Sequence, residues 1–406
     1  MNEVHTTPAP MEKVKDAGAA RLAKGKRTTV NRRRERTSNH RKRLLLYMAL
    51  AGMLLLLALF ALVYGGLQLA AQTNGANPSS SNTVSITPLA KVQPAVVHTY
   101  SVFPSNAGLM LPVVDGQGFV WFGEMETNHL ARLDPRTGAV KTWTPPGGEY
   151  GIMTNVTDRQ GKVWFTEQNA NYIAVFDPTR QTFRTFGFGT GKQHRVGLQD
   201  LQFDASGKLW FTEMTGRRIG RLDPASGRIQ TWDLPNAAGG AVTYPFGLSI
   251  TRNGQVWFGT FAGGMLGHLD PKTGQIKLYT LADPREQVYA MAGDGQGRIW
   301  FTELQFGKLG MIDTTTGKVI ELTVPGTLGN PEDLHSVVVT PDGNVWFTSS
   351  GTNSLVRYSP KNATFTFFQI PLPYSGLFGL AADAAGRLWF TAGGGQQANY
   401  IGVMAL

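Results

Sequence analysis

The chain contains no cysteine in its 406 residues. This absence excludes disulfide bonds, thiolate metal sites and cysteine nucleophiles from the whole chain. The sequence also lacks a Gly-x-Ser-x-Gly motif, so nothing in it supports a serine hydrolase of the nucleophile-elbow type. Charged residues make up 16% of the sequence, and their uneven distribution divides the chain into parts.

Positive charge is concentrated at the N-terminus. Residues 1–43 contain 13 of the 38 Lys and Arg residues but 4 of the 28 Asp and Glu residues, so the rest of the chain is nearly neutral. The basic residues end in Arg41-Lys42-Arg43, directly before an apolar run, where a membrane-topology signal normally stands. No aromatic or helical recognition pattern accompanies them, so we do not expect nucleic-acid binding.

The longest apolar run extends from Leu44 to Tyr64 and contains 21 residues without a charge. At ~1.5 Å per residue this run crosses a hydrocarbon core of ~30 Å, which predicts one transmembrane helix over residues 44–64. A cleaved signal peptide is the alternative, but its apolar region is usually ~7–15 residues long, and no clean cleavage site follows this run. We therefore expect an uncleaved single-pass anchor in the cell membrane, with residues 1–43 as a cytoplasmic tail and the remaining chain extracytoplasmic.

Residues 65–94 are expected to connect the anchor to the rest of the chain. Between Gln72 and Ala90 the sequence is rich in Asn, Ser, Thr and Pro, and it has neither a charged residue nor a long apolar run. Such a composition is typical of a flexible linker.

A Trp-Phe pair recurs at the end of short β-type runs in residues 95–406. The spacings between successive pairs are 43, 46, 47, 43, 46 and 43 residues. A period in the forties with several strands per unit predicts a β-propeller. The pairs, one for each of seven predicted blades, are Trp121-Phe122, Trp164-Phe165, Trp210-Phe211, Trp257-Phe258, Trp300-Phe301, Trp346-Phe347 and Trp389-Phe390.

Turn residues divide each unit into four strands. Examples are Asp204-Ala-Ser-Gly207 and Pro224-Ala-Ser-Gly227, whose residue types supply the backbone angles of tight turns. In six units an outer-strand residue lies 22 positions after the tryptophan, but in the seventh that position falls beyond the C-terminus. Tyr100, within residues 97–102, has the spacing of the missing strand. The sequence therefore predicts an all-β, seven-bladed propeller of four-stranded blades, closed by an N-terminal outer strand.

Two columns of the repeat are predicted to surround the axial mouth. When the inner hairpin is folded about its turn, the position eleven residues before each tryptophan meets the positions just after it, on one rim. The longer connections between units end on this rim, and insertions gathered on one face are typical of a binding face. The first column is Met110, Met153, Gln199, Phe246, Tyr289, His335 and Phe378; the second is Glu124, Glu167, Glu213, Thr260, Glu303, Ser349 and Ala392.

The first column is mainly aromatic and apolar. It indicates a ligand with hydrophobic or aromatic parts, either a small molecule or a peptide. The candidate ligand-binding residues are Met153, Gln199, Phe246, Tyr289 and Phe378. We expect the chain to be a monomer.

The glutamates of the second column have a structural and a functional interpretation. As repeated residues, they are expected either to form ion pairs with neighbouring-blade cations such as Arg132, Arg221 or Arg357, or to cap strand ends. One connection differs, because Glu332-Asp333-Leu334-His335 brings two carboxylates and an imidazole to the mouth. These groups can hold a divalent cation or remove a proton, although a rim loop with incidental polar residues is equally compatible with the sequence.

The repeat, with Trp210-Phe-Thr-Glu213 and Trp300-Phe-Thr-Glu303 among its closest matches, resembles the streptogramin B lyase family, also called the virginiamycin B lyase family. The resemblance covers residues 97–406. It implies a magnesium-dependent carbon-oxygen lyase that opens a cyclic depsipeptide antibiotic, an activity that confers antibiotic resistance. In this chain it implies His335 as the base and Asp333, with Glu332 or Glu303, at the metal.

The sequence departs from the family pattern at two positions. Tyr289 stands where the family has a second histidine, and Ser349 stands where it has a metal-binding glutamate. These substitutions favour a membrane-tethered propeller that binds a ligand at its mouth without full lyase activity. The lyase remains the alternative. A propeller lactonase is a third possibility, which no residue selects.

Overall fold

The computed structural model describes residues 89–102, 104, 107–147, 151–188, 196–236, 240, 242–304, 306–325, 334–372, 376–393 and 399–406. The predicted basic tail and the predicted helix over residues 44–64 lie outside these residues. Within the part of the chain that the structure describes, no helix has the length and hydrophobicity needed to cross a membrane.

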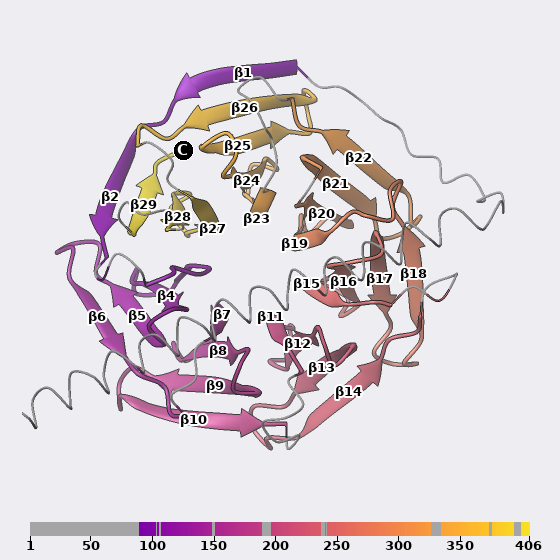
Figure 1. The fold of residues 1–406 in the computed structure, drawn as a ribbon, viewed down its shortest axis with the longest axis horizontal. Coiled ribbons are helices and arrows are strands. Elements are labelled where there is room, and N and C mark those ends of the chain that lie inside the picture. The colour runs from indigo at the N-terminus through magenta and orange to yellow at the C-terminus, as the bar shows by residue number, and fades with distance from the viewer. Residues whose placement is uncertain are drawn as a thin grey trace, which may run out of the picture. The chain divides into compact units, whose positions relative to one another are not determined.

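Seven sheets are arranged in a ring around a common axis (Figure 1), which confirms the predicted seven-bladed propeller. Four strands with short turns form each of the first three blades. Blade 1 contains β3 (Val113–Val114), β4 (Val120–Glu124), β5 (His129–Leu133) and β6 (Val140–Trp143). Blade 2 contains β7 (Ile152–Thr157), β8 (Val163–Glu167), β9 (Tyr172–Asp177) and β10 (Thr182–Gly187). Blade 3 contains β11 (Leu198–Phe203), β12 (Leu209–Glu213), β13 (Arg218–Leu222) and β14 (Ile229–Asp233).

The next two blades repeat this arrangement, and the last two add strands from the N-terminal side. Blade 4 contains β15 (Pro245–Ile250), β16 (Val256–Thr260), β17 (Met265–Leu269) and β18 (Ile276–Thr280). Blade 5 contains β19 (Val288–Gly293), β20 (Arg298–Glu303), β21 (Lys308–Asp313) and β22 (Val319–Thr323). Blade 6 contains β23 (Leu334–Val339), β24 (Val345–Ser349), β25 (Ser354–Ser359) and β26 (Thr364–Gln369). Blade 7 contains β27 (Leu377–Ala382), β28 (Leu388–Ala392) and β29 (Tyr400–Met404).

The ring closes as the sequence predicts. Strand β2 (Val97–Ser101) pairs antiparallel with β29 and supplies the fourth strand of blade 7 (Figure 1). Tyr100 stacks on Trp389 at a centroid distance of 6.1 Å, just as Trp143 stacks on Trp121 at 5.4 Å in blade 1. The closing strand therefore reproduces the aromatic packing of a complete blade.

The structure differs from the predicted linker at its C-terminal end. Strand β1 (Leu89–Pro94) pairs in parallel with β26 and gives blade 6 a fifth, outermost strand (Figure 1). Ala95 then donates its backbone N–H to the carbonyl of Gln369 at 2.9 Å. Two successive strands on neighbouring blades thus attach the N-terminal side to the ring, and the edge of β26 is covered.

The Trp-Phe pairs hold adjacent blades together. Successive residues of a strand point to opposite faces, so each pair places one large ring on either side of its blade. Trp164 and Phe211 share one buried cluster between blades 2 and 3, and Trp389 and Phe122 share another where blade 7 meets blade 1. The tryptophan of one blade therefore packs with the phenylalanine of the next around the whole ring, which confirms the packing interpretation of the repeat.

Candidate functional site

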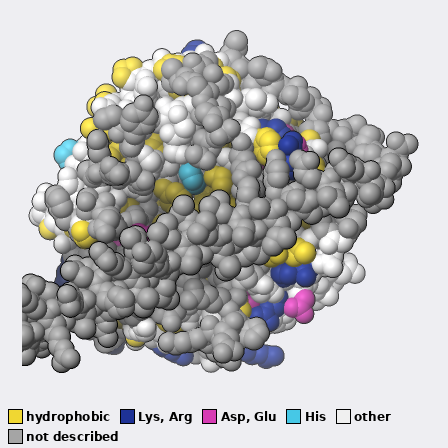
Figure 2. Space-filling view, viewed as in Figure 1, with side chains coloured by type: hydrophobic (Ala, Val, Ile, Leu, Met, Phe, Trp, Pro, Cys, Tyr) yellow, Lys and Arg dark blue, Asp and Glu magenta, His cyan; other side chains and the backbone are white. Residues whose placement is uncertain are grey.

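The inner strands surround an axial cavity of about 310 Å³. Six residues of the predicted mouth column line it: Met110, Met153, Gln199, Phe246, Tyr289 and Phe378. The seventh, His335, lies 5.3 Å from the ring of Tyr289 and 4.8 Å from that of Phe378, measured between centroids. Figure 2 shows hydrophobic side chains and a histidine gathered in a hollow near the centre of this face. The structure therefore brings together all five candidate ligand-binding residues and His335.

Threonines two residues after the signature tryptophans hold the mouth residues in place. Four of the five donate their hydroxyl hydrogen to the backbone carbonyl of the mouth residue in the next blade. The four pairs are Thr166 to Gln199 at 3.2 Å, Thr212 to Phe246 at 2.8 Å, Thr302 to His335 at 2.7 Å and Thr348 to Phe378 at 2.9 Å. The threonine of the repeat thus links every such mouth residue to the blade before it.

The same hydroxyl groups also accept a backbone N–H from the inner strand of their own blade. Inner strands carry a register shift near the mouth, for example between Leu198 and Leu201, which leaves a backbone N–H without a ladder partner. The Thr212 hydroxyl accepts that N–H, from Asp200, at 3.0 Å. Each threonine therefore stabilises two mouth segments through one side chain.

The wall of the cavity formed by blades 2 and 3 is polar. The Asp200 carboxylate accepts the backbone N–H of Leu201 at 2.8 Å and that of Leu248, in the next blade, at 2.9 Å. Burial raises the pKa of Asp200 to about 7, although both hydrogen bonds act to lower it. Gln199, next to Asp200, is 2% exposed, and no described residue hydrogen-bonds to its side-chain amide.

The wall formed by blades 4, 5 and 7 is aromatic. Phe246 lies 4.7 Å from Tyr289 and 5.0 Å from Phe261, and Tyr289 lies 5.9 Å from Phe378. Burial, together with the charge of Asp200, raises the pKa of the Tyr289 hydroxyl, so this side chain is neutral near pH 7. The cavity can therefore offer ring contacts on one side and hydrogen bonds on the other.

The second predicted column lies on the same rim but does not face the cavity. Its glutamates are fully buried within their blades, and those of blades 1, 3 and 5 pair with a residue five positions later on the next strand. Arg218 donates to Glu213 at 2.8 Å, and His129 lies 3.1 Å from Glu124. The predicted pairing with arginines of neighbouring blades is therefore wrong, because the ladder places Arg218 directly opposite Glu213.

The arginines named in that prediction have another role. Arg132 lies 4.2 Å from the ring centre of Phe119, and Arg221 and Arg357 lie 5.2 and 5.7 Å from Trp210 and Trp346. These cation–π contacts cover the outer parts of the aromatic clusters.

Glu303, predicted as a metal ligand, belongs to a buried cluster in blade 5. Its carboxylate and those of Glu286 and Glu321 lie within 4.8 Å of one another. Lys308 hydrogen-bonds to Glu286, and its ammonium lies 3.1 Å from Glu321 and 3.6 Å from Glu303. Burial and the charges of Glu286 and Glu321 raise the pKa of Glu303 well above its usual range. A lysine of the chain itself therefore supplies the cation for these carboxylates.

The other residues of the predicted metal site are only partly described. Glu332 and Asp333 lie outside the described residues. Ser349 is buried, and its hydroxyl accepts a hydrogen bond from Thr352 at 2.8 Å. Magnesium needs near-octahedral ligation by hard oxygen atoms, and the described residues around His335 do not offer such a set.

Sequence reasoning did not single out Asp200 or the threonines. Asp200 stands one position after the mouth column, where the register shift turns an additional residue toward the axis. Among the seven residues ten positions before the tryptophans it is the only carboxylate, which is the signal that could have found it.

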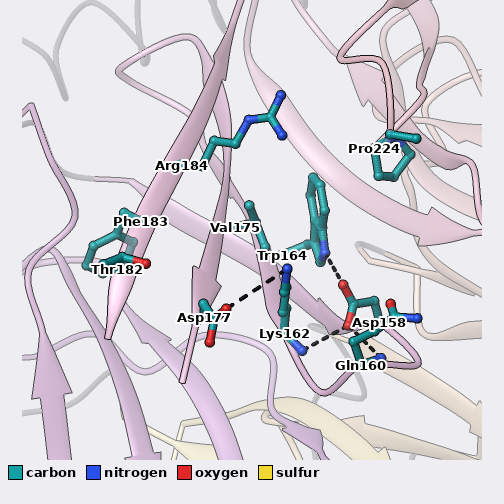
Figure 3. Close-up of a pocket in the computed structure, with 11 residues that line it drawn as sticks. Asp158, Gln160, Lys162, Trp164, Val175, Asp177, Thr182, Phe183, Arg184 and Pro224 are labelled. Atoms are coloured by element: carbon teal, nitrogen blue, oxygen red, sulfur yellow. Dashed lines mark hydrogen bonds and ion pairs between the residues drawn. The ribbon is translucent and has the colours of Figure 1, made fainter. Parts of the chain in front are cut away.

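A second cavity, of about 360 Å³, lies between blades 2 and 3 on the opposite rim (Figure 3). Asp158 accepts the indole N–H of Trp164 at 2.9 Å and the backbone N–H of Lys162 at 2.9 Å. Lys162 in turn lies 4.0 Å from Asp177. Asp158, Lys162 and Asp177 are thus engaged with each other or with the hairpin turn, which indicates a structural role.

Comparisons with known proteins agree with this architecture. The sequence profile of the virginiamycin B lyase family matches residues 81–337. A streptogramin B lyase structure is 25% identical, with a TM-score of 0.67 over 77% of this chain and 97% of the other. Virginiamycin B lyase from Staphylococcus aureus is 22% identical, with a TM-score of 0.68 over 77% of this chain and 99% of the other.

A further structure is that of a catalytically inactive histidine-to-alanine variant of the Staphylococcus aureus enzyme with quinupristin. It is 22% identical to this chain, with a TM-score of 0.67 over 77% of this chain and 99% of the other. A search of curated protein sequences finds no match. Because the family profile covers more than half of the sequence, the chain belongs to the virginiamycin B lyase family.

Proposed function

We propose that this propeller binds a ligand with aromatic or hydrophobic parts at its axial mouth, without full lyase activity. The observation that carries the proposal is the contact between Phe246, Tyr289, His335 and Phe378 around the axial cavity. Aromatic rings that line a concave space with a few polar groups are typical of small-molecule sites.

The departures from the family pattern support binding over catalysis. Tyr289 is held neutral by its surroundings and cannot act as a base near pH 7. Ser349 offers a hydroxyl already engaged with Thr352. The mouth therefore keeps its binding surface, while two positions expected to carry chemistry have changed.

Titration of the purified full chain with quinupristin, followed by calorimetry, tests the proposal. Binding should weaken about tenfold or more in Tyr289→Ala and in His335→Ala, because each removes a ring from the mouth. Phe183→Ala is the matched control, since Phe183 lines the cavity on the opposite rim. Unchanged binding in both mouth variants would count decisively against a mouth site.

A carbon-oxygen lyase is the second candidate, favoured by the position of His335 in the mouth. In such an elimination His335 would take the proton from the carbon next to a carbonyl, the ester carbon-oxygen bond would break, and an alkene and a carboxylate would form. Magnesium, where bound, would make that proton more acidic. The product would be linear with unchanged mass, whereas a lactonase product would gain the mass of water, so mass spectrometry separates the two reactions. The His335→Ala variant should abolish the elimination.

We also propose that residues 44–64 anchor the chain in the cell membrane with the propeller outside the cytoplasm. The support is the uncharged run of 21 residues that directly follows a basic segment. Protease added to intact cells should digest the propeller but spare residues 1–43. Release of the chain by alkaline carbonate would exclude a spanning helix.

A further inference from the structure

The axial cavity has an unsatisfied polar group on one wall. Gln199 is 2% exposed, lines the cavity and has no described hydrogen-bond partner for either its Nε2 or its Oε1 atom. On the same wall, no described residue donates to the Oδ1 atom of Asn155. A buried amide without partners costs ~1–3 kcal/mol, so such groups are normally bound to water or to a ligand.

Asp200 adds a negative charge beside this amide. Each of its carboxylate oxygens accepts one backbone N–H and so retains a lone pair for a further donor. The side chain lines the cavity, and no described cation forms an ion pair with it. A carboxylate in a partly apolar cavity without a counter-ion attracts a cation that can enter from outside.

The geometry points to a subsite in which Asp200 and Gln199 hold a protonated amine, while Tyr289 and Phe246 contact an aromatic ring of the same ligand. This inference rests on the proposed function, because it needs the mouth to bind a ligand, and it names the ligand class as an arylalkylamine. An ammonium group donates to Asp200 and to the Gln199 carbonyl. The cavity of about 310 Å³ is within the range of small-molecule sites.

The pH dependence follows from the groups that face Asp200. Strands β7 and β15, packed on either side, carry no titratable side chain, while β8 and β12 end in Glu167 and Glu213. Tyr289 faces Asp200 from β19, and the ring of His335 lies 5.3 Å from that of Tyr289. Because burial raises the pKa of Asp200 to about 7, its negative charge should be lost as the pH falls from 8 to 6. Binding of an amine should weaken over the same range.

The test compares 2-phenylethylamine with its neutral isostere 2-phenylethanol, titrated into the full chain at pH 8 and pH 6 and followed by NMR. At pH 8 the amine should bind about tenfold more tightly than the alcohol, and this ratio should fall at pH 6. Asp200→Asn should bring the ratio close to one. Gln199→Leu should reduce the ratio several-fold. This second variant leaves intact the hydrogen bonds that Asp200 accepts from the backbone of Leu201 and Leu248.

Two controls separate the subsite from general effects. Asp233→Asn removes one exposed negative charge from the same blade and should leave the ratio unchanged. Tyr289→Ala should weaken both ligands equally. If the wild-type chain bound amine and alcohol equally, and Tyr289→Ala still weakened both, the amine subsite would be overturned. The proposal that the mouth binds a ligand would stand. Binding of neither ligand would overturn the subsite, whereas the mouth proposal depends on the quinupristin titration. An amine preference that survives Asp200→Asn would also overturn the subsite.

Discussion

Thr302 donates its hydroxyl hydrogen to the backbone carbonyl of His335 at 2.7 Å, across the boundary between blades 5 and 6. The same hydroxyl accepts the backbone N–H of Ala290, the residue after Tyr289, at 3.2 Å. One side chain in the repeated Trp-Phe-Thr motif therefore connects the mouth segments of blades 5 and 6, which carry Tyr289 and His335. The repeat both builds the blades and aligns the mouth.

Thr302→Val should lower the free energy of unfolding by about 1–2 kcal/mol, because it leaves a buried carbonyl and a buried N–H without a partner. Urea denaturation measures this loss. Thr302→Ser keeps the hydroxyl and should lose less, and Thr323→Val, at an exposed strand end, should lose little. Equal stability of Thr302→Val and the wild type would show that the two hydrogen bonds of the Thr302 hydroxyl contribute nothing to the free energy of unfolding.

Two blades replace this threonine with glycine for a steric reason. A Cβ atom at Gly259 would lie 2.1 Å from the Cγ1 atom of Val288 in the next blade, and one at Gly123 would lie 2.4 Å from a methyl group of Ile152. Gly259→Ala should therefore cost about 1–3 kcal/mol of stability through overpacking. Val288→Ala creates room, so the double variant should lose less than the sum of the two single losses. Additive losses would contradict direct contact.

The features that the sequence predicts well depend on spacing alone. The seven Trp-Phe pairs determine the blade count, and Tyr100 identifies the closing strand because its distance from Trp143 equals one repeat. The mouth column followed from folding the inner hairpin about its turn. Applying the same operation to the next hairpin would have placed Arg218 opposite Glu213, as the ladder shows. That partner was therefore predictable.

Other features could not be read from spacing. Strand β1 pairs in parallel with β26 and has no counterpart in the repeat, so the spacing of the repeat does not predict it. The cavity-facing position of Asp200 depends on a register shift, which moves one residue out of the alternation that strand patterns assume. Local departures from a repeat can be found only in the structure, whereas the repeat itself can be found in the sequence.

The hairpin aspartates predict a stabilising substitution. In four blades the aspartate six residues before the tryptophan accepts the indole N–H, as Asp204 does for Trp210 at 2.8 Å. Blade 4 has Thr251 at this position, and no described residue accepts the buried indole N–H of Trp257. Thr251→Asp should add about 1 kcal/mol of stability by supplying that acceptor. Thr251→Val cannot accept the proton and should be no more stable than the wild type. A thermal denaturation series that ranked these two variants in the reverse order would refute the assignment.

Glu213 predicts a pH-dependent difference in stability. Burial raises the pKa of its carboxyl above the ordinary value, and the hydrogen bond and charge of Arg218 lower it without cancelling the effect. The folded state thus holds the Glu213 proton more strongly than the unfolded state. The contribution of that proton to wild-type stability is complete below the ordinary pKa of ~4.3 and is lost as the pH rises through the raised folded value.

Glutamine at this position does not titrate. The free energy of unfolding of Glu213→Gln, relative to that of the wild type, should therefore move in favour of the variant as the pH rises from 4 to 8. Urea denaturation at intervals of one pH unit measures this difference, and Glu126→Gln, at an exposed position, should show no such trend. A relative stability that moves toward the wild type with rising pH would mean that the ion pair with Arg218 outweighs the cost of burying the charge.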